Sequence, residues 1–143
     1  MDPREFQRFA FRMVTSSDQP AQMRTAVSRA YYAVFNVGVE HLERLGFKVN
    51  KGPKGHHDVI NRLSNSGDPD VERVGSQLTT LQHKRIQADY RLNEKNIENP
   101  NDAKLNVMLA DRLISTLDQR CSSPNSKSLV AAIKNWEKAT GLK

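Results

Sequence analysis

Positions 71, 74, 78, 81, 85, 88 and 92 follow one another at alternating steps of three and four, and six of these seven residues are apolar: Val71, Val74, Leu78, Leu81, Ala88 and Leu92. This spacing places the side chains on one face of an α-helix, whereas a half-buried strand needs an apolar residue at every second position. Helical spacing continues along most of the chain, and alternating β-branched residues are absent. The sequence therefore predicts an all-α fold.

Turn-forming residues divide this pattern into segments. The predicted helices cover about residues 3–15, 19–45, 58–64, 70–92, 102–120 and 126–138. Asp68 before Pro69 is a typical N-cap and first-turn pair for the fourth of these helices. Long helices with short connections favour an antiparallel up-and-down bundle of four to five helices. Because 143 residues is the size of one domain, we expect residues 1–143 to form a single helical domain.

Composition limits the cellular location and the kinds of partner that we expect. The 22 basic and 16 acidic residues give a net charge of +6, which suits nucleic acid or another anionic partner. Cys121 is the single cysteine, so no intrachain disulfide can form and a reducing cytoplasm is the expected location. No apolar run is long enough to cross a bilayer, and residues 1–11 lack the apolar segment of a secretion signal.

Several familiar motifs are missing from the sequence. It contains no P-loop, no dinucleotide-binding glycine motif and no nucleophile elbow. The histidines and acidic residues do not have the spacing of metal ligands, so we expect neither a metal nor a cofactor. A helix-turn-helix within residues 58–82 is a weak alternative, because no short helix there carries a set of base-reading side chains.

Arg85 is the one charged member of the 71–92 stripe. A guanidinium on a packed face stays charged and is costly unless it has partners. Asp89, four residues on, can form an ion pair with it, and Tyr90 borders the same groove. One interpretation is a structural Arg85–Asp89 pair that braces two helices. The other is that Arg85 lines a polar crevice or interface and binds phosphate through its planar fork.

The predicted helix over residues 19–45 carries two adjacent tyrosines and two arginines. Tyr31 and Tyr32 point about 100° apart, so one can pack in the core while the other reaches a polar neighbour. Buried hydroxyls need partners, which Arg85 and Asp89 could supply; plain aromatic packing is the alternative. Arg24 and Arg29 are expected to share an exposed border of this helix, as ligand contacts or as solvated charges.

The segment 47–57 is predicted to be a loop rich in basic residues. It contains Lys51, Lys54, His56 and His57 together with two glycines and a proline. Each histidine could act as an acid or base near neutral pH, or could simply cap the short helix that follows. The loop as a whole could contact a ligand or remain solvated.

Three segments, in this order, resemble the HEPN superfamily. Residues 26–35 read AVSRAYYAVF, the lysine and histidine loop leads into Asp58-Val-Ile, and residues 85–90 read RIQADY. The likeness is greatest to the small stand-alone branch that keeps an Arg-x-x-Ala-Asp-Tyr segment. It covers about residues 20–120, with the predicted helix at 126–138 beyond it.

The resemblance implies an up-and-down bundle of four or five helices that forms a homodimer. Many members of the superfamily are metal-independent endoribonucleases that act as toxins, in RNA processing or in antiphage defence. In active members an arginine is followed after four to six residues by a histidine, and two protomers join these motifs in a basic cleft. Arg85 matches that arginine, whereas Tyr90 stands at the position of the histidine.

We therefore expect a cytoplasmic, HEPN-like, RNA-binding homodimer of a toxin–antitoxin or antiphage system. Its candidate catalytic residues are Arg85, Tyr90, Asp89 and His57, and its candidate RNA-binding residues are Arg29, Tyr31, Tyr32, Lys51, Lys54 and His56. Catalysis itself stays open, because tyrosine with its high reference pKa is a poor general base near neutral pH. The alternative is a non-catalytic helical adaptor, for example a partner of a minimal nucleotidyltransferase.

Overall fold

The computed structural model describes residues 1–122 and 124–141, and all regular structure in these ranges is helical. The elements are α1 (Arg4–Ser16), α2 (Pro20–Arg44), α3 (Lys54–Ser64), α4 (Pro69–Tyr90), a 3-10 turn η1 (Lys95–Glu98), α5 (Pro100–Arg120) and α6 (Ser126–Thr140). The all-α prediction is confirmed. Among the described helices, none combines the length and the apolar character needed to cross a bilayer.

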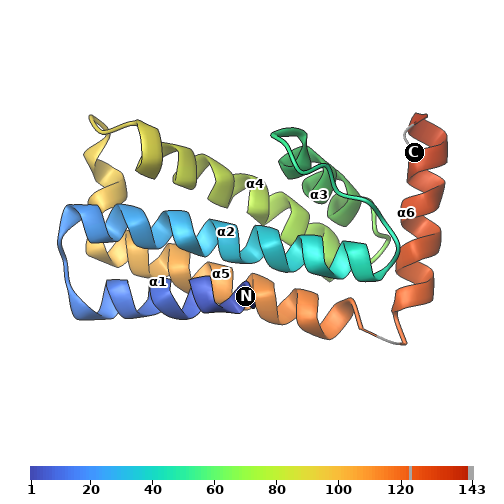
Figure 1. Cartoon of the computed structure of the whole chain (residues 1–143), viewed down its shortest axis with the longest axis horizontal. Helices are drawn as coiled ribbons and strands as arrows, with labels where there is room; N and C mark the ends of the chain where they lie inside the picture. Colours follow the sequence, from blue (N-terminus) through green and yellow to red (C-terminus); the bar gives the residue numbers. More distant parts are fainter. Residues whose placement is uncertain (123, 142–143) are drawn as a thin grey trace.

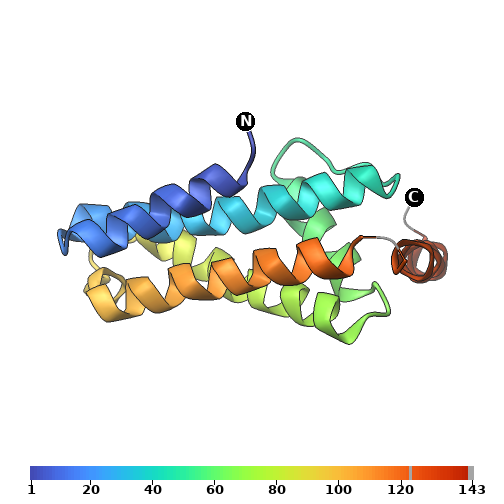
Figure 2. The same ribbon diagram turned by 90° about the horizontal axis from the view of Figure 1, so that it is seen from below.

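Four long helices form two layers. α1 and α2 lie side by side in front of α4 and α5 in Figure 1, and the same two pairs lie above and below one another in Figure 2. Each of these helices runs opposite to the one before it along the chain. α3 packs against α4 and the C-terminal half of α2, and α6 crosses the end of the layers.

The core lies between the two layers, where the apolar faces of the helices meet. α2 buries the residues Ala26, Ala30, Val34 and Val37 there. α5 buries Ala103, Val107, Ala110, Ile114 and Leu117. Asp68 caps α4 as predicted, because its side chain accepts hydrogen bonds from the backbone N–H groups of Asp70 and Val71. Arg85 is buried on the packed face of α4.

The end of α4 differs from the prediction. The helix ends at Tyr90, and Leu92, which was expected on the apolar face, is 68% exposed. Arg24 was expected at an exposed border, but it is buried against this helix end. Its guanidinium donates hydrogen bonds to the carbonyl oxygens of Gln87 and Ala88, so it replaces the N–H groups of the next helical turn.

The start of α3 also differs. The helix begins at Lys54 and includes His56 and His57, which the sequence placed in a loop. The loop before α3 is fixed to this helix, because the Asn50 N–H donates to the Asp58 carboxylate at 2.9 Å. A side chain at Gly55 would collide with the carbonyl oxygen of Asn50, so glycine is what permits this close approach.

α6 is longer than predicted by two residues at its C-terminal end. Leu129 and Ile133 are buried, whereas Trp136 is only partly buried. Glu137 accepts hydrogen bonds from Arg62 of α3, which also lies over the Trp136 ring. These contacts hold the C-terminal helix to the rest of the chain.

The crossing of α3 over α4 depends on Gly75. A Cβ atom at this position would lie 2.9 Å from the backbone nitrogen of Ser64 and 3.2 Å from the carbonyl oxygen of Ile60. Since backbone atoms cannot rotate away, any larger residue must push α3 outward.

We expect Gly75→Ala to lower the free energy of unfolding by about 1–3 kcal/mol, the usual cost of overpacking. Urea unfolding followed by circular dichroism measures the change. Ser76→Ala, at the neighbouring exposed position, is the matched control and should be close to neutral. A Gly75→Ala protein as stable as the control would contradict the close packing described here.

Candidate functional site

Three arginines are buried among the described residues, and in two of them every guanidinium nitrogen donates a hydrogen bond. Arg24 donates to Glu98 at 2.7 Å and to five backbone carbonyls around the end of α4. Arg62 donates to Glu137 through two nitrogens and to the Asp58 carbonyl through the third. These two guanidinium groups are structural, since a carboxylate pairs with each charge and every nitrogen donates at least one hydrogen bond.

Arg85 is the exception. It is only 8% exposed, yet within residues 1–122 and 124–141 none of its N–H groups makes a hydrogen bond. Its Nε atom is fully buried without a partner. Asp89 lies 3.8 Å from Nη1, which is an ion-pair contact longer than a hydrogen bond. The Arg85–Asp89 pair predicted from the spacing is therefore present but loose.

Two aromatic rings hold the Arg85 guanidinium in place. It lies 5.5 Å from the ring centroid of Tyr31 and 5.4 Å from that of Tyr32, both within the range of a cation–π interaction. These rings stabilise the charge without using any N–H donor. The arrangement leaves a fixed guanidinium whose two terminal nitrogens carry four N–H groups that make no hydrogen bond to the described residues, whereas the Nε–H group is sealed from solvent.

Arg29 extends this arrangement toward α1. Its guanidinium lies 4.9 Å from the Tyr32 ring and 5.4 Å from the Phe6 ring. Phe6, Arg29, Tyr32, Arg85 and Tyr31 therefore alternate aromatic and cationic groups; we call these five residues the cation–aromatic row. It crosses three helices, with one member on α1, three on α2 and one on α4.

His56 joins the row through Tyr31. Its Nδ1 atom is hydrogen-bonded to the Tyr31 hydroxyl, and its ring stacks on Phe35 with centroids 4.4 Å apart. Burial, and then the nearby positive charge of Arg85, hold the pKa of His56 below its ordinary value of 6.5. The imidazole is consequently neutral at physiological pH.

The hydrogen bond defines which ring nitrogen carries the proton. Tyr31 is fully buried, and burial raises the pKa of its hydroxyl, so the hydroxyl keeps its proton near neutral pH. His56 Nδ1 is the acceptor for that proton among the described residues. A neutral imidazole has one N–H group, which therefore lies on Nε2. The tyrosine partner is His56 rather than Arg85 or Asp89, which the sequence suggested.

The other predicted site residues lie at the surface. His57, Lys51 and Lys54 are exposed, and their side chains make no hydrogen bond within the described part of the chain. Tyr90 is 73% exposed at the last position of α4. The structure thus brings Arg85, Asp89, Arg29, Tyr31, Tyr32 and His56 into one connected group, and leaves these four outside its contacts.

Three residues that contact this group were not among the site residues predicted from the sequence. Ser28 donates to Asp89 at 3.1 Å, Phe35 stacks on His56, and Phe6 lies under Arg29. Phe35 and Ser28 lie four residues after Tyr31 and four before Tyr32, so helical spacing could have included them. Nothing local to Phe6 indicated its role, because its partner is on another helix.

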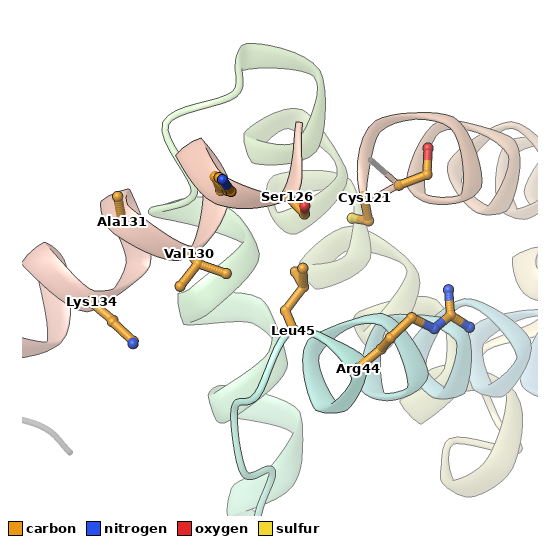
Figure 3. A pocket seen from close by; sticks show the side chains of 9 residues that line it. Arg44, Leu45, Cys121, Ser126, Val130, Ala131 and Lys134 are labelled. Atoms are coloured by element: carbon orange, nitrogen blue, oxygen red, sulfur yellow. The ribbon is translucent and has the colours of Figure 1, made fainter. Parts of the chain in front are cut away.

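A separate hollow of about 750 Å³ lies where the ends of α2 and α5 meet α6 (Figure 3). Leu45, Val130 and Cys121 form its apolar part, and Arg44, Lys127 and Lys134 are exposed around it. Burial raises the pKa of the Cys121 thiol to about 11, so the sulfur is not a thiolate nucleophile near neutral pH. None of the predicted site residues lines this hollow.

Comparisons of the chain with protein-family models, with curated proteins and with solved structures give no match. The side-chain geometry around Arg85 is therefore the basis on which a function can be assigned to this chain.

Replacing buried arginines by methionine should separate their roles. Arg24→Met is expected to lower the free energy of unfolding by about 3–5 kcal/mol, because it leaves Glu98 and several carbonyls unpaired. Arg85→Met keeps a long side chain and removes a charge that has no hydrogen-bond partner, so stability should be unchanged or slightly higher. Thermal and urea unfolding measure both. A loss at Arg85 as large as the loss at Arg24 would make Arg85 a structural residue.

Stability should also depend on pH through His56. The pKa of His56 is lower in the folded chain, so below a pH of about 7 the unfolded chain binds more protons than the folded chain. The contribution of His56 to stability is therefore complete above its unfolded pKa of about 6.5 and declines as the pH falls below that value. Wild type should therefore lose stability relative to His56→Gln between about pH 7.5 and pH 5. NMR titration of the His56 ring in a His57→Gln background gives an independent measurement. A His56 midpoint above 6.5 would contradict the burial argument.

Proposed function

We propose that this chain is a HEPN-like RNA-binding protein that holds an RNA phosphate at Arg85. The observation that carries the proposal is a buried guanidinium in cation–π contact with two rings, whose N–H groups make no hydrogen bond to the described residues. Keeping such a group in the folded state is costly, and natural proteins retain costly polar groups mainly where they bind or react. The up-and-down arrangement of the four long helices and the AVSRAYYAVF and RIQADY segments support the same assignment.

Phosphate suits this site better than a carboxylate ligand alone. The planar guanidinium can contact two phosphate oxygens at once, and Arg29 adds a second positive charge along the row. Tyr31 is sealed from solvent, but the partly exposed Tyr32 ring lies between the two cations, where an unpaired base could stack. Single-stranded RNA provides both groups.

The catalytic form of the proposal uses Arg85 and His56. Metal-independent RNA cleavage requires removal of the 2′-hydroxyl proton, attack of the 2′-oxygen on phosphorus and protonation of the departing 5′-oxygen. Arg85 would stabilise the added negative charge on phosphorus. His56, neutral with its proton on Nε2, would donate a hydrogen bond from that N–H group to the departing 5′-oxygen. The 2′-hydroxyl proton has no assigned acceptor in one protomer; Tyr90 and His57 from a second copy are the candidates that the homodimer hypothesis supplies, and the group that accepts this proton would then pass it to the 5′-oxygen.

Removing the Arg85 side chain should abolish the proposed activity. We expect Arg85→Ala to weaken single-stranded RNA binding by roughly 10- to 150-fold, the equivalent of a charge-assisted contact of about 1.5–3 kcal/mol. Cleavage of total RNA in EDTA should fall by about 10²–10³-fold. Binding is measured by fluorescence anisotropy across a salt series, and the mass of the complex by sedimentation.

Two variants complete this test. Arg73→Ala removes an exposed arginine of the same helix and should leave binding nearly unchanged. His56→Gln should retain binding but lose cleavage, which separates the catalytic form from a binding module. The proposal would be overturned if the RNA affinity changed neither with the salt concentration nor with the Arg85→Ala substitution.

A non-catalytic adaptor is the second candidate, and one feature favours it. Phe11, Leu105 and Met108 are 55%, 63% and 57% exposed on α1 and α5, which is unusual for large apolar side chains. Such a face suits a protein partner, for example a nucleotidyltransferase as the family resemblance suggests. A stable complex that is lost in Met108→Glu and retains no RNA would favour this function.

A further inference from the structure

The cation–aromatic row leads from Arg85 to a hollow on the outer side of α1. This hollow, of about 460 Å³, is lined by Glu5, Phe6, Arg8, Phe9, Arg12 and Arg29 together with Met1; we call it the α1 hollow. Arg29 belongs both to the row and to the hollow. The volume lies within the range of about 300–1,000 Å³ that is typical of small-ligand sites.

The charges of the α1 hollow are not neutralised by the protein. Among the described side chains, no carboxylate lies within ion-pair distance of Arg8, Arg12 or Arg29, and Glu5 is the only acidic residue of the lining. Elsewhere in the chain most exposed arginines are paired, such as Arg73 with Asp70 and Arg91 with Glu94. The hollow is therefore an electropositive surface that is open to an anionic ligand.

The aromatic groups of the hollow offer stacking surfaces. Phe9 is 43% exposed, and Arg12 lies 5.9 Å from its ring centroid. Phe6 lies under Arg29 at 5.4 Å, so both rings are paired with a guanidinium. Aromatic rings and guanidinium planes are the groups on which proteins stack unpaired bases, while the cations contact the backbone.

We infer that the α1 hollow is a base-stacking subsite for single-stranded RNA whose neighbouring phosphate is held at Arg85. The strand crosses α2 along Arg29, and a base of a following nucleotide stacks on Phe9. This inference rests on the proposed function, because it places the hollow on the path of the same RNA. The subsite determines how many nucleotides the protein contacts on one side of the phosphate held at Arg85.

The length of the RNA tests the subsite. A ribodinucleotide with its only phosphodiester at Arg85 has no further nucleotide to reach α1, whereas an octanucleotide does. We expect Phe9→Ala to weaken octanucleotide binding by about 5- to 100-fold, the loss that follows removal of one base–aromatic stack, with no change for the dinucleotide. Phe9→Tyr should restore the affinity. Phe11→Ala, an exposed aromatic of the same helix that lines a different groove, is the matched control.

A second measurement does not depend on a loss of binding. The chain has one tryptophan, Trp136 on α6, so Phe9→Trp introduces a fluorophore into the α1 hollow. Octanucleotide binding should quench its emission, and dinucleotide binding should not. Arg85-dependent RNA binding that is insensitive to Phe9→Ala and gives no quenching would overturn the subsite alone. Binding that is independent of Arg85 would overturn the proposed function as well.

Discussion

A positive charge inside a protein must be matched by hydrogen bonds, by an opposite charge or by a ligand, because transfer out of water removes its hydration. This chain buries three guanidinium groups and matches two of them internally. Arg24 closes the end of α4, and Arg62 joins α3 to α6. Arg85 lies in the same packed interior with stacked rings and one distant carboxylate. That contrast is the basis of the role proposed for Arg85.

α2 organises this group of residues because its side chains point toward three other helices. Arg24 and Ser28 reach α4, Arg29 reaches α1, and Tyr31 reaches α3. Site residues from α1, α3 and α4, which contribute one or two each, are thereby brought together beside α2. A helix of 25 residues is long enough to contact all of them while its opposite side stays in the core.

The sequence predicted much of this arrangement, and its errors have physical causes. Helical periodicity gave the elements and the buried position of Arg85, since burial of one face determines both. It placed Leu92 in the core because the periodicity of α4 carries no information about Arg24. This residue, which stands 63 positions before Gln87 in the sequence, donates to the last carbonyls of α4 and so closes the helix. It placed His56 in a loop because glycine and proline are typical of turns, whereas here Gly55 permits close contact with Asn50. Pairs between helices, such as Tyr31 with His56, leave no periodic trace in the sequence.

The stacking of Arg85 on two tyrosines has a consequence for binding thermodynamics. A free arginine loses about 2 kcal/mol of rotamer entropy when a ligand immobilises it. Here Tyr31 and Tyr32 restrict the side chain before any ligand arrives. That entropy is lost during folding rather than during association, so an anion that contacts this guanidinium does not have to offset the ordering of the side chain.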